Sequence, residues 1–223
     1  MALKDLIVAL PMVVALTVPL IAASPVSDQS AIPCQPCVEC TDDAGPRVVR
    51  LRMYNQTRLD ESVFASILDV TNHIWAAYGV SVEATTNLDA ITVVVSAGTM
   101  HGTVDAAPIP VGDTLFTQGH ATPYIHLWLG AAELLARNSE GDGQSFTMKP
   151  VVERDAILLR MLGVALAHEL GHYLLDTSHH SSAGLLQSTM AAGEMEQPNL
   201  AHLRLSRKEL QMMCQRPDRP VPQ

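Results

Sequence analysis

The sequence predicts an α+β fold, with a mixed, twisted sheet of about five strands, a long apolar helix and a C-terminal helix. Three observations carry this prediction: a period-two alternation that begins at residue 47, several apolar runs of strand length before residue 130, and a much longer apolar stretch that ends at Leu175. Hydrophobic residues make up 48% of the 223 residues and charged residues only 17%, which excludes a long disordered chain.

The first elements of the domain alternate between strand and helix patterns. Residues 47–54 alternate apolar and cationic side chains, which is typical of a strand. Asp60 is a candidate cap for a helix that Gly79 would end, and its apolar positions recur every three or four residues: Val63, Ile67, Val70, Ile74 and Ala77. Residues 80–84 and 91–97 are the next two strands, and the second is a continuous apolar run, as in strands buried on both faces.

Shorter elements follow the third strand. The connection 98–122 contains a short edge strand at 113–117. Residues 123–129 form the next expected strand, and residues 131–137 a short helix.

The longest predicted helix begins near Pro150 and continues to Leu175. A turn-rich stretch, 177–198, separates it from a last helix that starts at Ser206, where Glu209 completes the pattern of a capping box.

The N-terminus has the pattern of an export segment. Residues 6–23 carry no charge, follow Lys4 and end in small residues, so residues 1–23 are predicted to be a signal peptide or an N-terminal membrane segment. Pro11 and Pro19 favour the cleaved signal. Either form places the rest of the chain outside the cytoplasm, as a secreted, periplasmic or membrane-anchored protein. We expect contact with a membrane only through residues 6–23, if they are not cleaved.

The next segment, 24–46, is expected to be a cysteine-containing linker that precedes a folded domain over residues 47–223. Cys34, Cys37 and Cys40 lie in this linker and Cys214 lies near the C-terminus. In an oxidising compartment disulfides are favoured over a thiolate metal site, because the C-x-x-C-x-x-C spacing lacks a nearby fourth ligand. The pairing stays open among three combinations.

The charge balance excludes one class of partner. There are 14 Lys and Arg residues against 23 Asp and Glu residues, a formal net charge of −9. Nucleic-acid binding depends on clustered cations, so we expect no nucleic-acid partner. The sequence carries no indication of an oligomeric state.

The long helix contains the motif His168-Glu169-Leu170-Gly171-His172. Two histidines four residues apart lie on one face of a helix, where two imidazoles reach the same metal ion, and Glu169 lies beside that face as a candidate general base. Chance predicts only about 0.02 such motifs in a chain of this composition. Three protein ligands leave zinc a position for water, whose pKa the ion lowers, so the motif predicts a Zn²⁺ site for hydrolysis.

The third ligand is expected after the helix, where His179 and His180 are both candidates. From His168 to Met190 the sequence is HELGHYLLDTSHHSSAGLLQSTM, which resembles the metzincin zinc peptidases, whose pattern is H-E-x-x-H-x-x-G-x-x-H followed by a methionine-containing turn. The resemblance implies His168 and His172 as ligands and Met190 as the Met-turn residue.

This chain departs from the family pattern at two positions. Leu175 stands in the place of the family glycine and Ser178 in that of the third histidine, so the turn must be one or two residues longer. The resemblance to exported bacterial metzincin-like proteins with such a turn favours His180 over His179. Asp176, between these positions, is a candidate to cap the helix or to support a ligand.

The resemblance implies a metzincin-like fold and a zinc metallopeptidase-like catalytic domain at residues 47–223. The expected activity is hydrolysis of peptide bonds in a peptide or protein substrate, which would lie extended along an edge strand, with residues 113–117 the first choice. A free cysteine of the linker that occupies the metal's open position, as in matrix metalloproteinases, is a hypothesis for latency.

Three alternatives remain at this point. A gluzincin-type site would take Glu194 or Glu196 as its third ligand, although Gly193 and Pro198 disfavour a long helix there. The chain is otherwise an exported zinc-binding or structural protein without catalysis, or a zinc amidohydrolase acting on a non-peptide amide.

Overall fold

A computed structural model describes residues 47–57, 59–60, 62–100, 109–138 and 145–215. The predicted export segment, the linker and three of the four cysteines lie outside the described residues, so the disulfide pairing stays a prediction. Within the described part of the chain, no helix is both long and apolar enough to cross a membrane.

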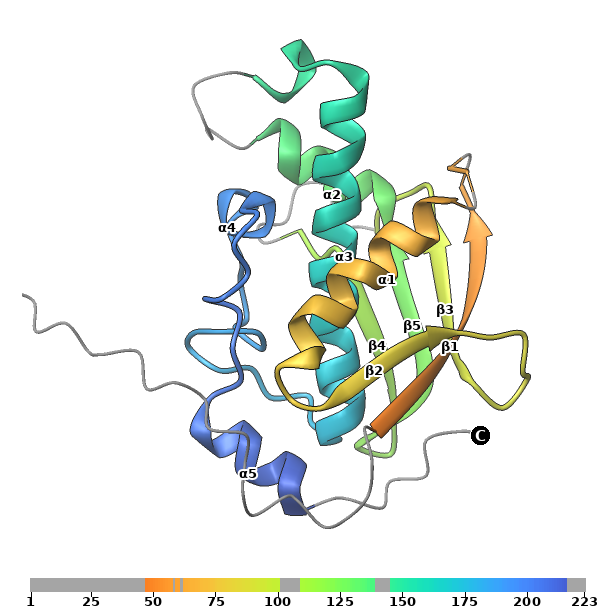
Figure 1. Ribbon diagram of the computed structural model, residues 1–223, viewed down its shortest axis with the longest axis vertical. Helices are drawn as coiled ribbons and strands as arrows, with labels where there is room; N and C mark the ends of the chain where they lie inside the picture. Colours follow the sequence, from red (N-terminus) through yellow and green to blue (C-terminus); the bar gives the residue numbers. More distant parts are fainter. Residues whose placement is uncertain (1–46, 58, 61, 101–108, 139–144, 216–223) are drawn as a thin grey trace, which may run out of the picture. The chain divides into compact units, whose positions relative to one another are not determined.

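Five strands form a single mixed sheet in the order β2-β1-β3-β5-β4. They are β1 (Arg47–Gln56), β2 (Val80–Ala84), β3 (Ile91–Ser96), β4 (Gly112–Thr117) and β5 (His120–Trp128). The pairs β1–β2, β1–β3 and β3–β5 are parallel, and β4 runs antiparallel to β5 at the edge (Figure 1). The α+β fold with a mixed sheet of about five strands is therefore confirmed, and so is the edge strand predicted at 113–117.

The helices are α1 (Ser62–Ala76), α2 (Leu129–Arg137), α3 (Val151–Leu175), α4 (Ala192–Glu196) and α5 (Arg207–Gln215), with a 3₁₀ turn, η1, at Phe146–Met148. Both α1 and α3 cover the same face of the sheet (Figure 1). α1 contacts β2, and α3 contacts β5 and β4. The long helix α3 thus lies beneath the edge strand, which determines where the site forms.

The helix ends follow the predicted capping chemistry. Oδ1 of Asp60 accepts a hydrogen bond from the amide of Ser62 at 3.1 Å. α1 ends at Ala76, earlier than expected, and Gly79, with φ of +68°, closes the turn between α1 and β2. At the start of α5, Glu209 accepts from the amide of Ser206, and the Ser206 hydroxyl accepts from the amide of Glu209 at 3.3 Å. The predicted capping box is confirmed.

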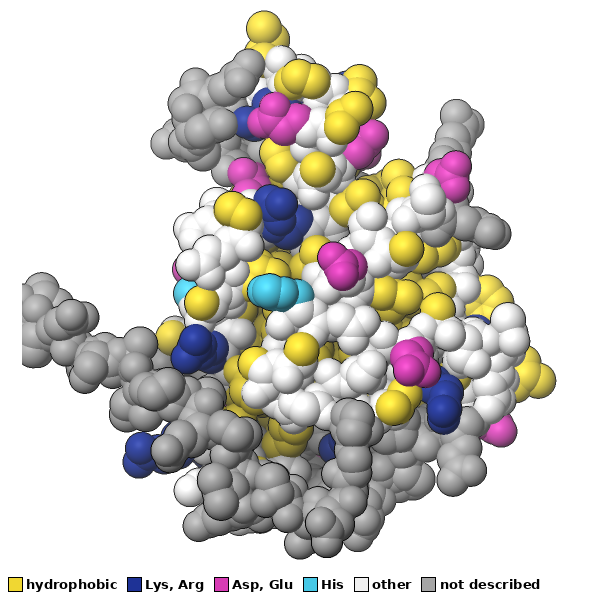
Figure 2. All heavy atoms as spheres, in the orientation of Figure 1, with side chains coloured by type: hydrophobic (Ala, Val, Ile, Leu, Met, Phe, Trp, Pro, Cys, Tyr) yellow, Lys and Arg dark blue, Asp and Glu magenta, His cyan; other side chains and the backbone are white. Residues whose placement is uncertain are grey.

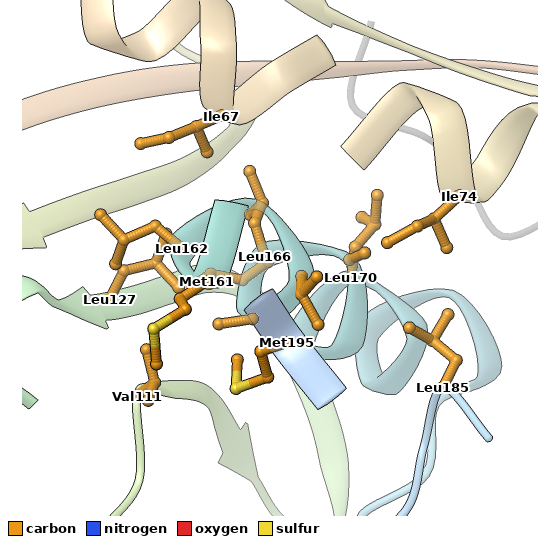
Figure 3. Packing of buried hydrophobic residues seen from close by; sticks show 14 of the residues in the cluster. Ile67, Ile74, Val111, Leu127, Met161, Leu162, Leu166, Leu170, Leu185 and Met195 are labelled. Atoms are coloured by element: carbon orange, nitrogen blue, oxygen red, sulfur yellow. The ribbon is translucent and has the colours of Figure 1, made fainter. Parts of the chain in front are cut away.

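The core lies between the sheet and its two covering helices. On β1, Val49 and Leu51 are fully buried, whereas the alternate residues Arg50 and Arg52 lie on the opposite face and are only half-buried. Figure 3 shows α3 at the centre of this core, with side chains of α1, β5 and α4 packed around it. Sixteen residues of α3 are buried, because the sheet, α1 and α4 contact it from different sides.

The packing of α1 on α3 is close and hydrogen-bonded. A Cβ atom added at Gly163 would lie 2.6 Å from Cβ of Val70, so only glycine fits at this crossing. The Thr71 hydroxyl lies 3.1 Å from the Gly163 carbonyl, and the indole of Trp75 donates to the Ala167 carbonyl at 3.1 Å. These contacts fix α3 against α1.

Two features differ from the sequence-based expectation. β5 begins at His120, three residues before the predicted start, because Gln118 and Gly119 both have positive φ and close a two-residue hairpin between β4 and β5. The helix α4 lies inside the stretch predicted to be turn-rich. Its first turn is stabilised by Glu194, whose Oε2 accepts from the amide of Ala191 at 2.8 Å.

The surface carries scattered charges on the face that includes α1. In Figure 2 the Lys and Arg side chains on this face lie singly among Asp and Glu side chains. Exposed apolar side chains gather over η1 and the start of α3, where Met148, Val151 and Val152 are 74%, 59% and 81% exposed. Among the described residues visible on this face, the Lys and Arg side chains form no basic patch.

Candidate metal centre

A cleft separates β4 from the segment that follows α3. Its cavity volume is about 950 Å³, and it is lined by β4, by α3 and by residues 187–191, together with Leu135, Asn138 and Met195. Three predicted site residues of α3 line it, namely His168, Glu169 and His172. The edge strand and the sequence motif therefore face the same space.

Three histidine side chains gather in this cleft. One turn of α3 separates His168 from His172, and their Nε2 atoms lie 3.0 Å apart. Nε2 of His180 lies 3.2 Å from Nε2 of His172, and one ligand atom of each residue lies within 4.8 Å of the others. His179 is exposed and is not part of this cluster. Of the two candidates after the helix, the geometry brings His180 to the pair.

Backbone carbonyls orient two of these rings. Nδ1 of His168 lies 2.7 Å from the Leu185 carbonyl, and Nδ1 of His172 lies 2.6 Å from the Thr177 carbonyl. Because a carbonyl oxygen only accepts, each Nδ1 carries the hydrogen and each neutral ring has its lone pair on Nε2. Both lone pairs then point into the cluster.

The pKa of each of the three rings lies below its ordinary value. Burial and the neighbouring histidines lower the pKa of His168 to about 3, and burial also lowers the pKa of His172 and of His180. Two lone pairs that face one another at 3.0 Å repel unless a cation lies between them. A tetrahedral zinc site, with bonds of about 2.0–2.1 Å, needs nitrogen atoms about 3.3 Å apart. The donor set fits such an ion, as do the separations of Nε2 of His172 from Nε2 of His168 and of His180, 3.0 and 3.2 Å.

Glu169 lies next to this cluster, under the edge strand. It is only 7% exposed, and burial raises its pKa to about 8. The hydroxyl of Thr114 on β4 lies 2.9 Å from Oε2 of Glu169 and 2.9 Å from its backbone carbonyl. No sequence pattern indicates Thr114 as a site residue, because 55 residues separate it from Glu169 and no local motif marks it.

The chain leaves α3 through a left-handed residue. Asp176, the C-cap, has φ of +49°, and the amide of Thr177 donates to the His172 carbonyl at 3.2 Å. The Asp176 carboxylate accepts from the amide of Ala121 at 2.8 Å and lies 2.8 Å from Nδ1 of His120. Of the two roles considered for Asp176, the helix cap is observed, and these contacts of its side chain lead to β5 instead of to a ligand.

The remaining candidates lie around the cleft. Met190 lines it and packs partly against the hydrophobic core. Glu194 Oε2 accepts from Gln187 and from the amide of Ala191, and neither Glu194 nor Glu196 belongs to the histidine cluster. The glutamate alternative for the third ligand therefore has no support in this geometry.

No protein-family model and no curated protein matches the chain. Among solved structures, the chain is similar to the archaemetzincin of Methanopyrus kandleri, with 12% identical residues and a TM-score of 0.43. The alignment covers 75% of this chain and 94% of that chain. A similarity at this level carries no conclusion about function.

Proposed function

We propose that the protein is a zinc-dependent, metzincin-like peptidase, with His168, His172 and His180 as the metal ligands and Glu169 as the general base. One observation carries the proposal: three imidazoles bring their ligand atoms within 4.8 Å of one another, next to a buried carboxyl group in a cleft. When bound, a zinc ion supplies a water of lowered pKa, polarises a carbonyl group and favours the carboxylate form of Glu169.

The residues around the ion have separate tasks in this proposal. The carbonyls of Leu185 and Thr177 hold the rings of His168 and His172 in the tautomer that presents Nε2. Glu169 takes a proton from water and delivers it to the leaving amine, which is the role of a general base that turns into a general acid. Met190 is proposed as the Met-turn residue beside the ligands.

The edge strand β4 supports a peptide as the substrate. One side of β4 pairs with β5 and its other side is free within the sheet, and Gly112 to Thr114 line the cleft. An extended peptide that pairs with a free strand edge gains main-chain hydrogen bonds, which a small amide cannot make. Peptides and proteins are therefore the proposed substrates. Export, through residues 1–23, is proposed from the apolar, uncharged run 6–23 alone.

Zinc content tests the metal site. We expect one equivalent of zinc per full-length chain, its loss in His168→Ala and in His180→Ala, and its retention in His179→Ala, measured by elemental analysis with folding checked by circular dichroism. A folded wild type that binds no supplied zinc would overturn the site. Zinc loss in His179→Ala, with zinc retained in His180→Ala, would show that His179 is the third ligand.

Hydrolysis tests the activity. Glu169→Gln should keep zinc and lose hydrolysis of an unstructured protein substrate, because the amide takes up no proton. A wild type that binds zinc but cleaves neither proteins nor peptides would be a binding protein. Cleavage of small amides alone would make it an amidohydrolase.

A further inference from the structure

The hydroxyl of Thr114 contacts Glu169 from the strand opposite α3. The residue is only 4% exposed, and its Oγ1 lies 2.9 Å from Oε2 of the carboxyl group. The backbone carbonyl of Glu169 lies at the same distance and is a second acceptor for the single hydroxyl hydrogen. The ionised carboxylate is the stronger acceptor, so the hydroxyl donates to Oε2 when Glu169 is ionised. Among the described residues this is the one hydrogen bond to the carboxyl group, and Oε1 has no such partner.

Gly112 provides the space that this carboxyl group occupies. A Cβ atom at residue 112 would lie 2.8 Å from Cγ of Glu169 and 3.2 Å from its Oε1. Positions 112 and 114 lie on the same face of β4, because side chains alternate along a strand. Gly112 therefore leaves room for the Glu169 side chain, and Thr114, the next residue on the same face of β4, binds it.

From these contacts we infer that Thr114 is a positioning residue for the general base, an inference that rests on the proposed function. Thr114 holds Oε2, so that Oε1 is the oxygen that accepts a proton from water as the water oxygen bonds to the carbonyl carbon. Oε1 then passes this proton to the leaving amine nitrogen as the C–N bond of the peptide breaks. In this proposal the substrate pairs with the edge of β4, and Thr114 of the same strand holds Glu169. β4 therefore positions the substrate and the base relative to each other.

Thr71 is a control for Thr114, because it is a buried threonine whose role is only structural. Thr71 is also fully buried, and its hydroxyl contacts the carbonyls of Ile67 and Gly163 at 2.9 and 3.1 Å. It fastens α1 to α3 without contact to the cleft. Thr71→Val therefore reproduces the loss of a buried hydroxyl group but leaves Glu169 untouched.

The experiment compares Thr114→Val, Thr114→Ser and Thr71→Val in the full-length, zinc-loaded protein. We expect Thr114→Val to lower kcat by about tenfold to a hundredfold, since a misplaced base loses most of its contribution. KM and the zinc affinity, measured by chelator competition, should stay within about twofold. Thr114→Ser should restore most of kcat, and Thr71→Val should lower stability without lowering kcat. In a Glu169→Gln background, Thr114→Val should not lower the small residual hydrolysis any further.

Several results would overturn the inference. One is a kcat for Thr114→Val within about twofold of the wild type, and another is an equal loss in Thr71→Val. A further loss in the Glu169→Gln background would show that Thr114 does not act through the base. A separate double-mutant cycle on unfolding of the metal-free protein measures the contact itself, and zero coupling energy would refute it. If the coupling is present but the wild type cleaves nothing, the proposed function fails and Thr114 is a structural residue.

Discussion

Glu169 makes the stability of the metal-free protein fall as pH rises. Its pKa lies near 8 in the folded chain, because burial disfavours the charged form, against an ordinary value of 4.5. Between these two pH values the unfolded chain has lost the proton that the folded chain keeps. By linkage, the contribution of Glu169 is fully present below pH 4.5 and is lost as pH rises towards 8.

The size of this effect follows from the same values. Each pKa unit corresponds to about 1.4 kcal/mol, so the rise from 4.5 to about 8 sets a ceiling of about 5 kcal/mol on the cost of ionising Glu169. Glu169→Gln removes this cost, since the amide stays neutral and its oxygen still accepts from Thr114. We therefore expect the variant to gain stability over the wild type by several kcal/mol between pH 5 and pH 8, within that ceiling.

Chemical denaturation of both metal-free proteins, at a series of pH values from about 5 to 9, measures this difference. The lowered pKa values of His168, His172 and His180 also make stability depend on pH, but they are common to both proteins and cancel in the difference. A difference that stays flat, or that shrinks as pH rises, would refute the reasoning that burial keeps the Glu169 carboxyl group neutral.

The remaining predictions concern packing and the exit from α3. Gly163→Ala should destabilise the protein by about 1–2 kcal/mol, because an added Cβ would lie 2.6 Å from a β-carbon of α1 and this clash outweighs the helix propensity of alanine. Gly193→Ala is the control, because a Cβ atom added at residue 193 has no neighbour within 4 Å. Equal denaturation midpoints in the two variants would contradict the predicted clash at Gly163. Asp176→Ala should cost about 1–2 kcal/mol by loss of the charged acceptor for the Ala121 amide. The His120 side chain is 75% exposed, so His120→Ala should lower stability only slightly. A loss equal to that of Asp176→Ala would assign the effect to the contact between His120 and Asp176 instead.

The spacing of apolar residues along the sequence predicted the strands and helices that bury one face in the core. The alternation at 47–54 matches β1, where Val49 and Leu51 enter the core, and the long apolar stretch matches α3 from residue 151 to Leu175. The start of β5 was predicted too late, because the hairpin depends on the positive φ angles of Gln118 and Gly119 and not on hydrophobic pattern. Helical spacing also placed His168 and His172 on one face.

The rest of the site depends on contacts that no spacing encodes. After Asp176 the backbone has no regular period, so the choice between His179 and His180 required the observed path of the turn. Thr114 reaches Glu169 only because β4 is the strand that lies at the sheet edge above α3. Sheet order is a global property of the chain, and local sequence did not determine it.

The carbonyls that hold the histidine rings come from a stretch of chain made after the helix. Thr177 and Leu185 supply them, and His180 lies between the two. A nascent chain that ends at Leu175 already carries the HELGH motif, but it lacks the third imidazole and both carbonyls that fix the ring tautomers. The centre therefore cannot form before the chain has been made through Leu185. A nascent chain that is shorter than this contains the motif without containing the site.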